Sequence, residues 1–174
     1  NANTTIDFTG TSVYTPETRV EMLTLSPLVP LPLDETLREQ LGGAYSPSAG
    51  GGCSRVPEQR YEFEVQYNSS PENVDKLSKT VFAIIDTLKT QPASASDINK
   101  VKEGIIRQRE VSLKQNNYWM SSIVAREQAG EDLAGMLQPY DDLVKAIDAN
   151  LIMNAARKYF DMNNYARFVL LPEM

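Results

Sequence analysis

The chain has 174 residues, of which 41% are hydrophobic and 23% charged, a composition typical of one globular domain rather than of a disordered or fibrous chain. Its formal net charge of -6 at pH 7 argues against nucleic acid as a partner, because binding to phosphates depends on clustered Lys and Arg. The absence of histidine excludes Ser-His-Asp and Cys-His catalytic centres, and the single cysteine, Cys53, cannot form a structural zinc site without histidine.

The start of the chain is expected to form a strand and then a helix. Residues 4–9 alternate apolar and polar side chains, which is the period of a half-buried strand. Thr15 and Pro16 form a typical helix start, with the threonine at the N-cap and the proline at the first helical position. We therefore predict a strand followed closely by a helix.

Three prolines limit the length of this helix. Pro27, Pro30 and Pro32 each lack a backbone donor and clash with the preceding helical turn, so residues 25–33 are predicted to be irregular or extended. A short helix is expected to restart over residues 34–41, and one of the two glycines that follow would stop it in a left-handed conformation.

The clearest strand pattern covers residues 60–68, where aromatic and aliphatic side chains alternate with polar ones. A turn over residues 56–59 before it predicts an antiparallel hairpin. The glycines at 50–52 lack the Lys and Ser or Thr of a phosphate-binding loop, and we expect them to permit a bulge or turn. Glu62 and Glu64, two apart on the polar face of the strand, are expected to meet water rather than to form a catalytic carboxylate pair.

The second half of the chain is predicted to be mostly helical. Apolar residues recur at helical spacing through residues 71–88, 97–113 and 119–130, and again in two short segments at 143–147 and 151–159. Residues 165–171 form a short apolar run that predicts a last buried strand. The resulting fold class is α+β, a mostly antiparallel sheet with helices packed on one face.

Residues 37–46 read Leu-Arg-Glu-Gln-Leu-Gly-Gly-Ala-Tyr-Ser, which closely resembles a signature in the C-terminal domains of pitrilysin/insulinase zinc peptidases. The resemblance continues in chain order through residues 61–74, 101–103, 117–119 and 159–172. It therefore extends over nearly the whole chain. It implies a half-domain of the pitrilysin/mitochondrial processing peptidase type, in which paired domains of similar fold enclose a chamber.

In that family one domain carries zinc on an inverted H-x-x-E-H motif, and the other supplies an arginine and a tyrosine to the substrate. This chain, which has no histidine, resembles the second kind, and Arg38 and Tyr45 match the family's pair in type and separation. The resemblance implies that Tyr45 donates to the oxyanion and that Arg38 holds a substrate carbonyl or carboxylate. From the residue types alone, Arg38 could instead pair with Asp34 while Tyr45 packs on the sheet.

The resemblance implies that residues 1–174 form a single non-catalytic peptidase-like domain, a fragment of a longer chain, that is inactive by itself. It would bind no cofactor, because zinc is expected in a catalytic partner domain on the same chain or on a separate subunit. The expected substrate is a peptide. The alternative is a catalytically dead structural or assembly module of the same fold. The chain departs from the family at residues 26–32, where we expect prolines to replace a continuous helix.

The expected surroundings of the domain follow from composition and resemblance together. No apolar stretch reaches about 18 residues, so no membrane partner is expected, and the net charge of -6 gives no reason to expect nucleic acid. One cysteine permits no intrachain disulfide and leaves the compartment open. The resemblance favours a bacterial source and a periplasmic setting.

Overall fold

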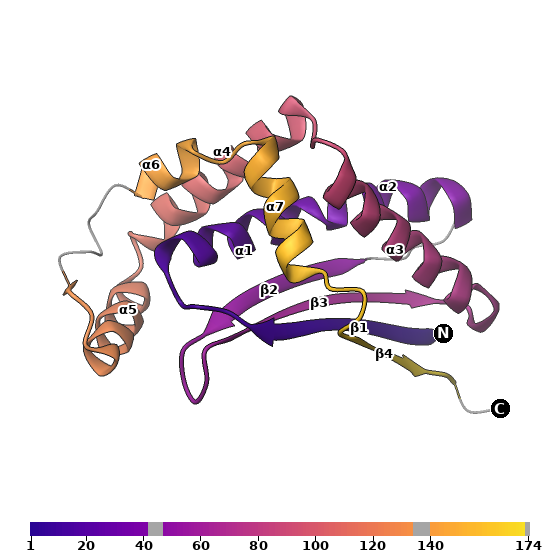
Figure 1. The fold of residues 1–174 in the computed structure, drawn as a ribbon, viewed down its shortest axis with the longest axis horizontal. Helices are drawn as coiled ribbons and strands as arrows, with labels where there is room; N and C mark the ends of the chain where they lie inside the picture. The colour runs from indigo at the N-terminus through magenta and orange to yellow at the C-terminus, as the bar shows by residue number, and fades with distance from the viewer. Residues whose placement is uncertain (42–46, 134–139, 173–174) are drawn as a thin grey trace.

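The computed structural model describes residues 1–41, 47–133 and 140–172, without the side chains of residues 36–41, 140 and 141. It confirms the α+β class, with a four-stranded antiparallel sheet and helices packed on a single face of the sheet (Figure 1). In chain order the elements are β1 (Ala2–Thr11), α1 (Pro16–Leu28), α2 (Pro30–Leu41), β2 (Ser48–Ser54), β3 (Arg60–Ser69), a 3-10 turn (Pro71–Asn73), α3 (Val74–Thr90), α4 (Ala95–Ser112), α5 (Asn116–Ala129), α6 (Tyr140–Lys145), α7 (Ala149–Tyr159) and β4 (Tyr165–Leu170).

The strands are ordered β2-β3-β1-β4, so the first strand of the chain lies inside the sheet. β1 pairs with β3 over ten residues, from Ala2 opposite Ser69 to Thr11 opposite Arg60. Side chains alternate in burial along both strands, as the period-2 pattern predicts, and the apolar set faces the helices. The polar set lies on the other face, which no described helix covers (Figure 1).

An aromatic cluster between sheet and helices forms the centre of the core. The ring of Phe160, which follows α7, meets Phe8 of β1 at 5.2 Å and Phe63 of β3 at 4.9 Å between centroids, both edge to face. Tyr61 and Tyr159 form a third such pair at 4.9 Å. These contacts hold α7 against the two central strands.

The predicted interruption of the first helix at residues 25–33 is wrong. α1 begins as expected, with a reciprocal capping box between Thr15 and Thr18, but it continues through Pro27 to Leu28. A break occurs only at Val29, and α2 then begins at Pro30 rather than at residue 34. The first four amides of a helix have no intrahelical acceptor, so Pro30 and Pro32 lose nothing in its first turn.

Two other expectations are corrected in the sheet. Gly50, Gly51 and Gly52 form no bulge or turn but the regular centre of β2, paired with β3 throughout. The last strand is present but not buried. Of the residues of β4 only Val169 is partly buried, and Phe168 and Leu170 are 60% and 73% exposed, because the strand lies at an edge of the sheet.

Candidate functional site

The run that carries the family resemblance lies where α2 leads toward β2. Arg38 is part of α2, and its backbone is helical. Its side chain and the whole of Tyr45 lie outside the described residues, so the expected contacts of this pair, with substrate or with Asp34 and the sheet, stay predictions. The helical backbone at residues 30–41 removes the expected departure from the family, since a helix does lead into this run.

Hydrogen bonds fix β2, the strand that follows the run, against α1. The Ser26 hydroxyl donates to the carbonyl of Met22 at 2.8 Å and accepts from the amide of Gly51 at 3.1 Å. A side chain at position 51 would collide with Phe63, because an added Cβ would lie 2.3 Å from its ring. The outer edge of β2 is thus held by a helix, and Gly51 is required by packing.

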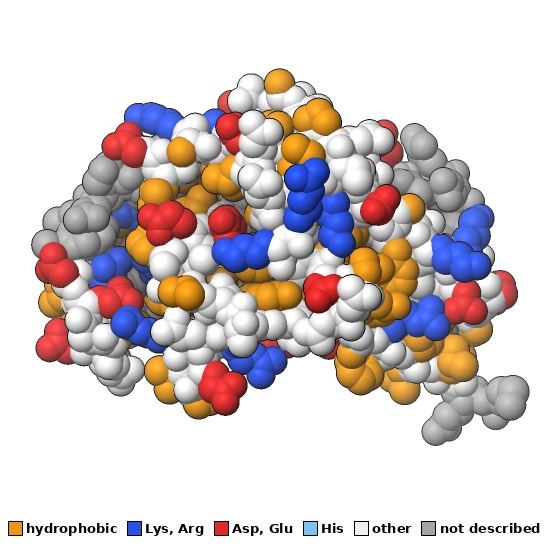
Figure 2. Space-filling view, in the orientation of Figure 1, with side chains coloured by type: hydrophobic (Ala, Val, Ile, Leu, Met, Phe, Trp, Pro, Cys, Tyr) orange, Lys and Arg blue, Asp and Glu red, His pale blue; other side chains and the backbone are white. Residues whose placement is uncertain are grey.

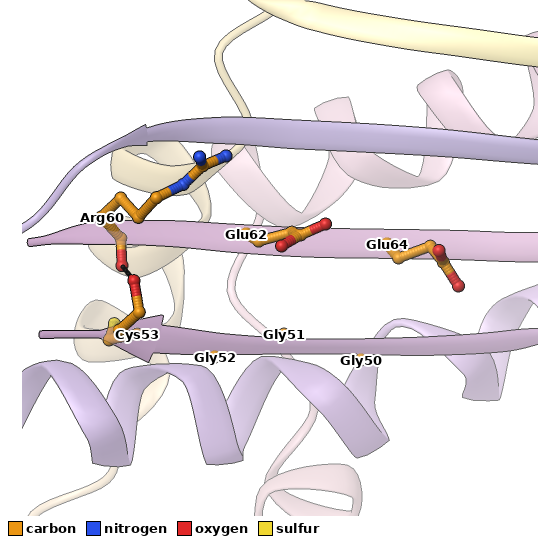
Figure 3. Close-up of a pocket in the computed structure, with 8 residues that line it drawn as sticks. Gly50, Gly51, Gly52, Cys53, Arg60, Glu62 and Glu64 are labelled. Atoms are coloured by element: carbon orange, nitrogen blue, oxygen red, sulfur yellow. Dashed lines mark hydrogen bonds between the residues drawn. The ribbon is translucent and has the colours of Figure 1, made fainter. Parts of the chain in front are cut away.

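The uncovered face of the sheet contains a trough beside β2 with a volume of about 570 Å³. We call it the open-face trough, and it is lined by residues 50–54 of β2 and by Arg60, Glu62 and Glu64 of β3. Figure 3 shows the two carboxylates at neighbouring outward positions of β3, beside the bare backbone of the β2 glycines. The two glutamates are exposed, as expected.

A third carboxylate, which the sequence reasoning missed, joins them. Asp7 of β1 lies directly opposite Glu64, and Thr9 lies opposite Glu62, all on the uncovered face. Burial, with the nearby Glu62 charge as a second cause, raises the pKa of Asp7, and its Oδ1 atom is buried without a hydrogen-bond partner. Alternation placed Asp7 on the polar face of a strand, but only the strand register reveals its acidic neighbours.

A second polar cluster ties two helices together at the margin of the core. The Tyr159 hydroxyl donates to Glu21 Oε2, and the Lys158 ammonium lies 2.9 Å from the same oxygen. Burial and this carboxylate together raise the pKa of the Tyr159 phenol. Tyr159 is fully buried whereas Lys158 and Glu21 are partly exposed, and the cluster joins α7 to α1.

The residues present do not fit a zinc site. The sequence has no histidine and one cysteine, and within the described residues no group of three or more Cys, Asp or Glu side chains is placed to hold a metal ion. We derive no catalytic step through a metal on this chain. None of the described helices is long and apolar enough to cross a membrane.

Comparison with known proteins points to one family. A family model described as "Peptidase M16 inactive domain" matches residues 5–105, which is more than half of the chain. None of the curated protein sequences matches it.

Solved structures agree in fold. The inactive peptidase domain of a putative zinc protease from Bordetella parapertussis has a TM-score of 0.78 at 12% identity, and the match covers 99% of this chain and 91% of that one. The ferredoxin protease FusC, solved in complex with Arabidopsis ferredoxin, has a TM-score of 0.80 at 18% identity. The periplasmic protease PqqL from Escherichia coli has a TM-score of 0.73 at 20% identity. The last two matches cover 99% of this chain and only 19% of the other.

Proposed function

The chain belongs to the family of peptidase M16 inactive domains, and on that premise we propose that it forms the substrate-side half of a zinc metalloendopeptidase. In this proposal residues 1–174 act as one non-catalytic domain. They complete the active site of a partner domain that holds zinc on an H-x-x-E-H motif, either on the same polypeptide or on a separate subunit. The family match, in a chain without histidine, is the observation that supports this division of labour.

Arg38 and Tyr45 are the residues that we propose contact the peptide. Zinc in the partner domain would activate the attacking water, which places negative charge on the oxygen of the scissile carbonyl. The Tyr45 hydroxyl is suited to donate to that oxygen, and the forked donors of Arg38 can hold a second carbonyl or a carboxylate of the substrate. Two features of the chain around this run support the roles proposed for Arg38 and Tyr45. The backbone of Arg38 is helical, and β2 beyond the run is anchored to α1.

Cleavage by a reconstituted enzyme tests the proposal. A fluorogenic peptide mixture is incubated with this chain, with a histidine-bearing M16 domain, and with the two together in the presence of zinc. We expect activity only in the combination, and a fall of roughly tenfold or more with Tyr45→Phe, the scale of a lost oxyanion donor. Arg38→Lys, which keeps the charge but loses the fork, should mainly raise KM.

Two matched variants control for damage to the fold. Tyr14→Phe removes a phenol hydroxyl that has no hydrogen-bond partner among the described residues, and Arg107→Lys changes an exposed arginine on α4. Both should leave cleavage unchanged. If the mixture is inert, or if Tyr45→Phe behaves like Tyr14→Phe, the domain is instead a structural or assembly module of the same fold.

A further inference from the structure

The uncovered face of the sheet has an arrangement that its own packing does not explain. The register places Gly50, Glu64, Asp7 and Ala166 in one row across all four strands. In this row the two edge strands contribute the small residues Gly50 and Ala166, and the two central strands contribute the carboxylates. In the next row Gly52 lies opposite Glu62, again a glycine beside a carboxylate.

Two of the three β2 glycines are not needed by the domain itself. A Cβ added at Gly50 or Gly52 would meet no atom within 4 Å, in contrast to the collision at Gly51. Glycine within a strand costs about 0.5–1 kcal/mol relative to alanine, so internal packing gives no reason for either residue. Glycines in strands also occur where another backbone must approach closely, and the open space above these two fits that role.

The negative charges on this face outnumber the positive ones, because Arg60 also lines the trough but forms no ion pair with the carboxylates among the described residues. Like charges directly opposite each other, such as Asp7 and Glu64, destabilise a sheet. Within the described part of the chain, none of Asp7, Glu62 and Glu64 forms an ion pair, and Asp7 Oδ1 is buried without a donor. These carboxylates do not form a group that could hold a metal ion, so the basic side chains of a polypeptide suit them better than a bound cation does.

Apolar side chains border the acidic centre on the β4 side. Phe168 and Leu170 lie opposite Thr5 and Asn3, on the same uncovered face, and both are largely exposed. Figure 2 shows hydrophobic side chains gathered along the lower edge of the molecule, at the end where the C-terminus lies. A surface with bare backbone, carboxylates and an apolar border is complementary to a polypeptide with basic and apolar residues.

We propose that the uncovered sheet face is a docking surface for a basic, partly apolar segment of a partner protein domain, whose Lys or Arg side chains meet Asp7, Glu62 and Glu64. The partner's backbone passes over Gly50 and Gly52, and its apolar residues cover Phe168 and Leu170. The inference does not depend on the proposed peptidase role, because its readout is binding rather than cleavage.

A peptide titration followed by NMR tests this docking surface. The 15N-labelled chain is titrated with an acetylated peptide of four Lys-Leu-Ala repeats, and separately with the same peptide carrying Glu in place of Lys. We expect only the lysine peptide to bind, with shift changes confined to amides of residues 5–9, 50–54, 60–64 and 165–170. The double variant Asp7→Asn/Glu64→Gln should weaken binding tenfold or more. The matched pair Glu103→Gln/Glu110→Gln on α4 removes the same charge elsewhere and should not.

A second variant separates docking from stability. Gly50→Val/Gly52→Val fills the trough with residues that favour strands, so we expect a higher urea midpoint together with at least fivefold weaker peptide binding. The proposal is overturned if the two peptides bind alike, if neither binds at millimolar concentration, or if the shifts lie on the helical layer. Equal effects of the two charge variants, or a dimer that forms through this face in light scattering without peptide, would also overturn it.

Discussion

The packing of β2 requires glycine at position 51 but not at the neighbouring position 52. An added Cβ at Gly51 would lie 2.3 Å from Phe63 Cδ2 and 2.9 Å from the Glu62 carbonyl oxygen, whereas at Gly52 it would meet nothing. We expect Gly51→Ala to lower the free energy of unfolding by about 1–3 kcal/mol through overpacking. Gly52→Ala should raise it by roughly 0.5 kcal/mol. Urea denaturation of both variants measures the difference, and equal effects would contradict this account of the strand.

The stability of the folded chain is expected to depend on pH through Tyr159. Burial and the Glu21 carboxylate raise the pKa of its phenol above the ordinary value of 10.0, so the folded chain keeps a proton that the unfolded chain loses. Its contribution to stability is complete below about pH 10 and falls as the pH rises further. Tyr159→Phe should cost about 2 kcal/mol at pH 7, the scale of a hydrogen bond to a charged group, and should flatten the alkaline decline. Unfolding followed between pH 7 and 11 tests this, with Tyr14→Phe as the control, and an unchanged decline would refute it.

Individual residues of the candidate site differ in how far the sequence alone predicts them. The absence of histidine and the family-like run that contains Arg38 and Tyr45 are both visible in the sequence, and together they support the proposed kind of domain. The grouping of Asp7 with Glu62 and Glu64 is not visible there. It depends on which residues of β1 and β3 lie opposite each other, and strands so far apart in the sequence carry no local signal of their register.

At the scale of elements, the prolines of α1 and α2 show why the local sequence mispredicted an irregular segment there. Within a helix a proline costs about 3 kcal/mol, which led to the expectation of an irregular segment. Here Leu25, Leu28, Val29 and Leu33 are all buried, and this apolar burial holds the segment helical despite Pro27. The position of each proline within its helix decides its cost, and that position depends on tertiary packing.

We therefore expect substitutions of Pro27 in α1 and Pro30 in α2 to change the free energy of unfolding in opposite directions. Pro27→Ala restores an amide that can donate to the carbonyl of Leu23, so the free energy of unfolding should rise by about 1–3 kcal/mol. Pro30→Ala removes a residue preorganised for the first helical turn, and the same quantity should fall by roughly 0.4–1 kcal/mol. The urea midpoints of both variants test these two predicted changes in stability. A loss of stability with Pro27→Ala would mean that the proline is accommodated in another way.

The burial of β4 was mispredicted for a related reason. A short, largely apolar run identifies a strand but not its place in the sheet. Among the described strands β4 pairs with β1 alone, and Phe168 and Leu170 lie on the uncovered face, although the sequence suggested that they were internal. Arg167, in the middle of the run, faces the helices, where it donates to Asp75 at 2.9 Å and to Ser78 at 3.1 Å.

Across the whole molecule, the packing predicts two levels of local stability. β1 and β3 pair over ten residues around the aromatic core, whereas α5 has no buried side chain among its residues and lies apart from the main helical layer (Figure 1). It is held mainly at its ends, where the Trp119 indole donates to the Leu113 carbonyl at 2.8 Å and Glu131 pairs with Arg55 and Arg126. A helix of 14 residues is marginal without tertiary packing.

Native-state hydrogen exchange should separate these levels. We expect amides of α5 to exchange through local opening, at a free energy at least about 2 kcal/mol below that of β1 and β3, which should exchange only on global unfolding. Arg55→Gln removes one tie to Glu131 and should lower the opening free energy of α5 while leaving β1 and β3 almost unchanged. Exchange of α5 together with the central strands would mean that the helix unfolds with the core. In that case Met120 and Val124 of α5 would have to stabilise the helix, although both side chains are exposed.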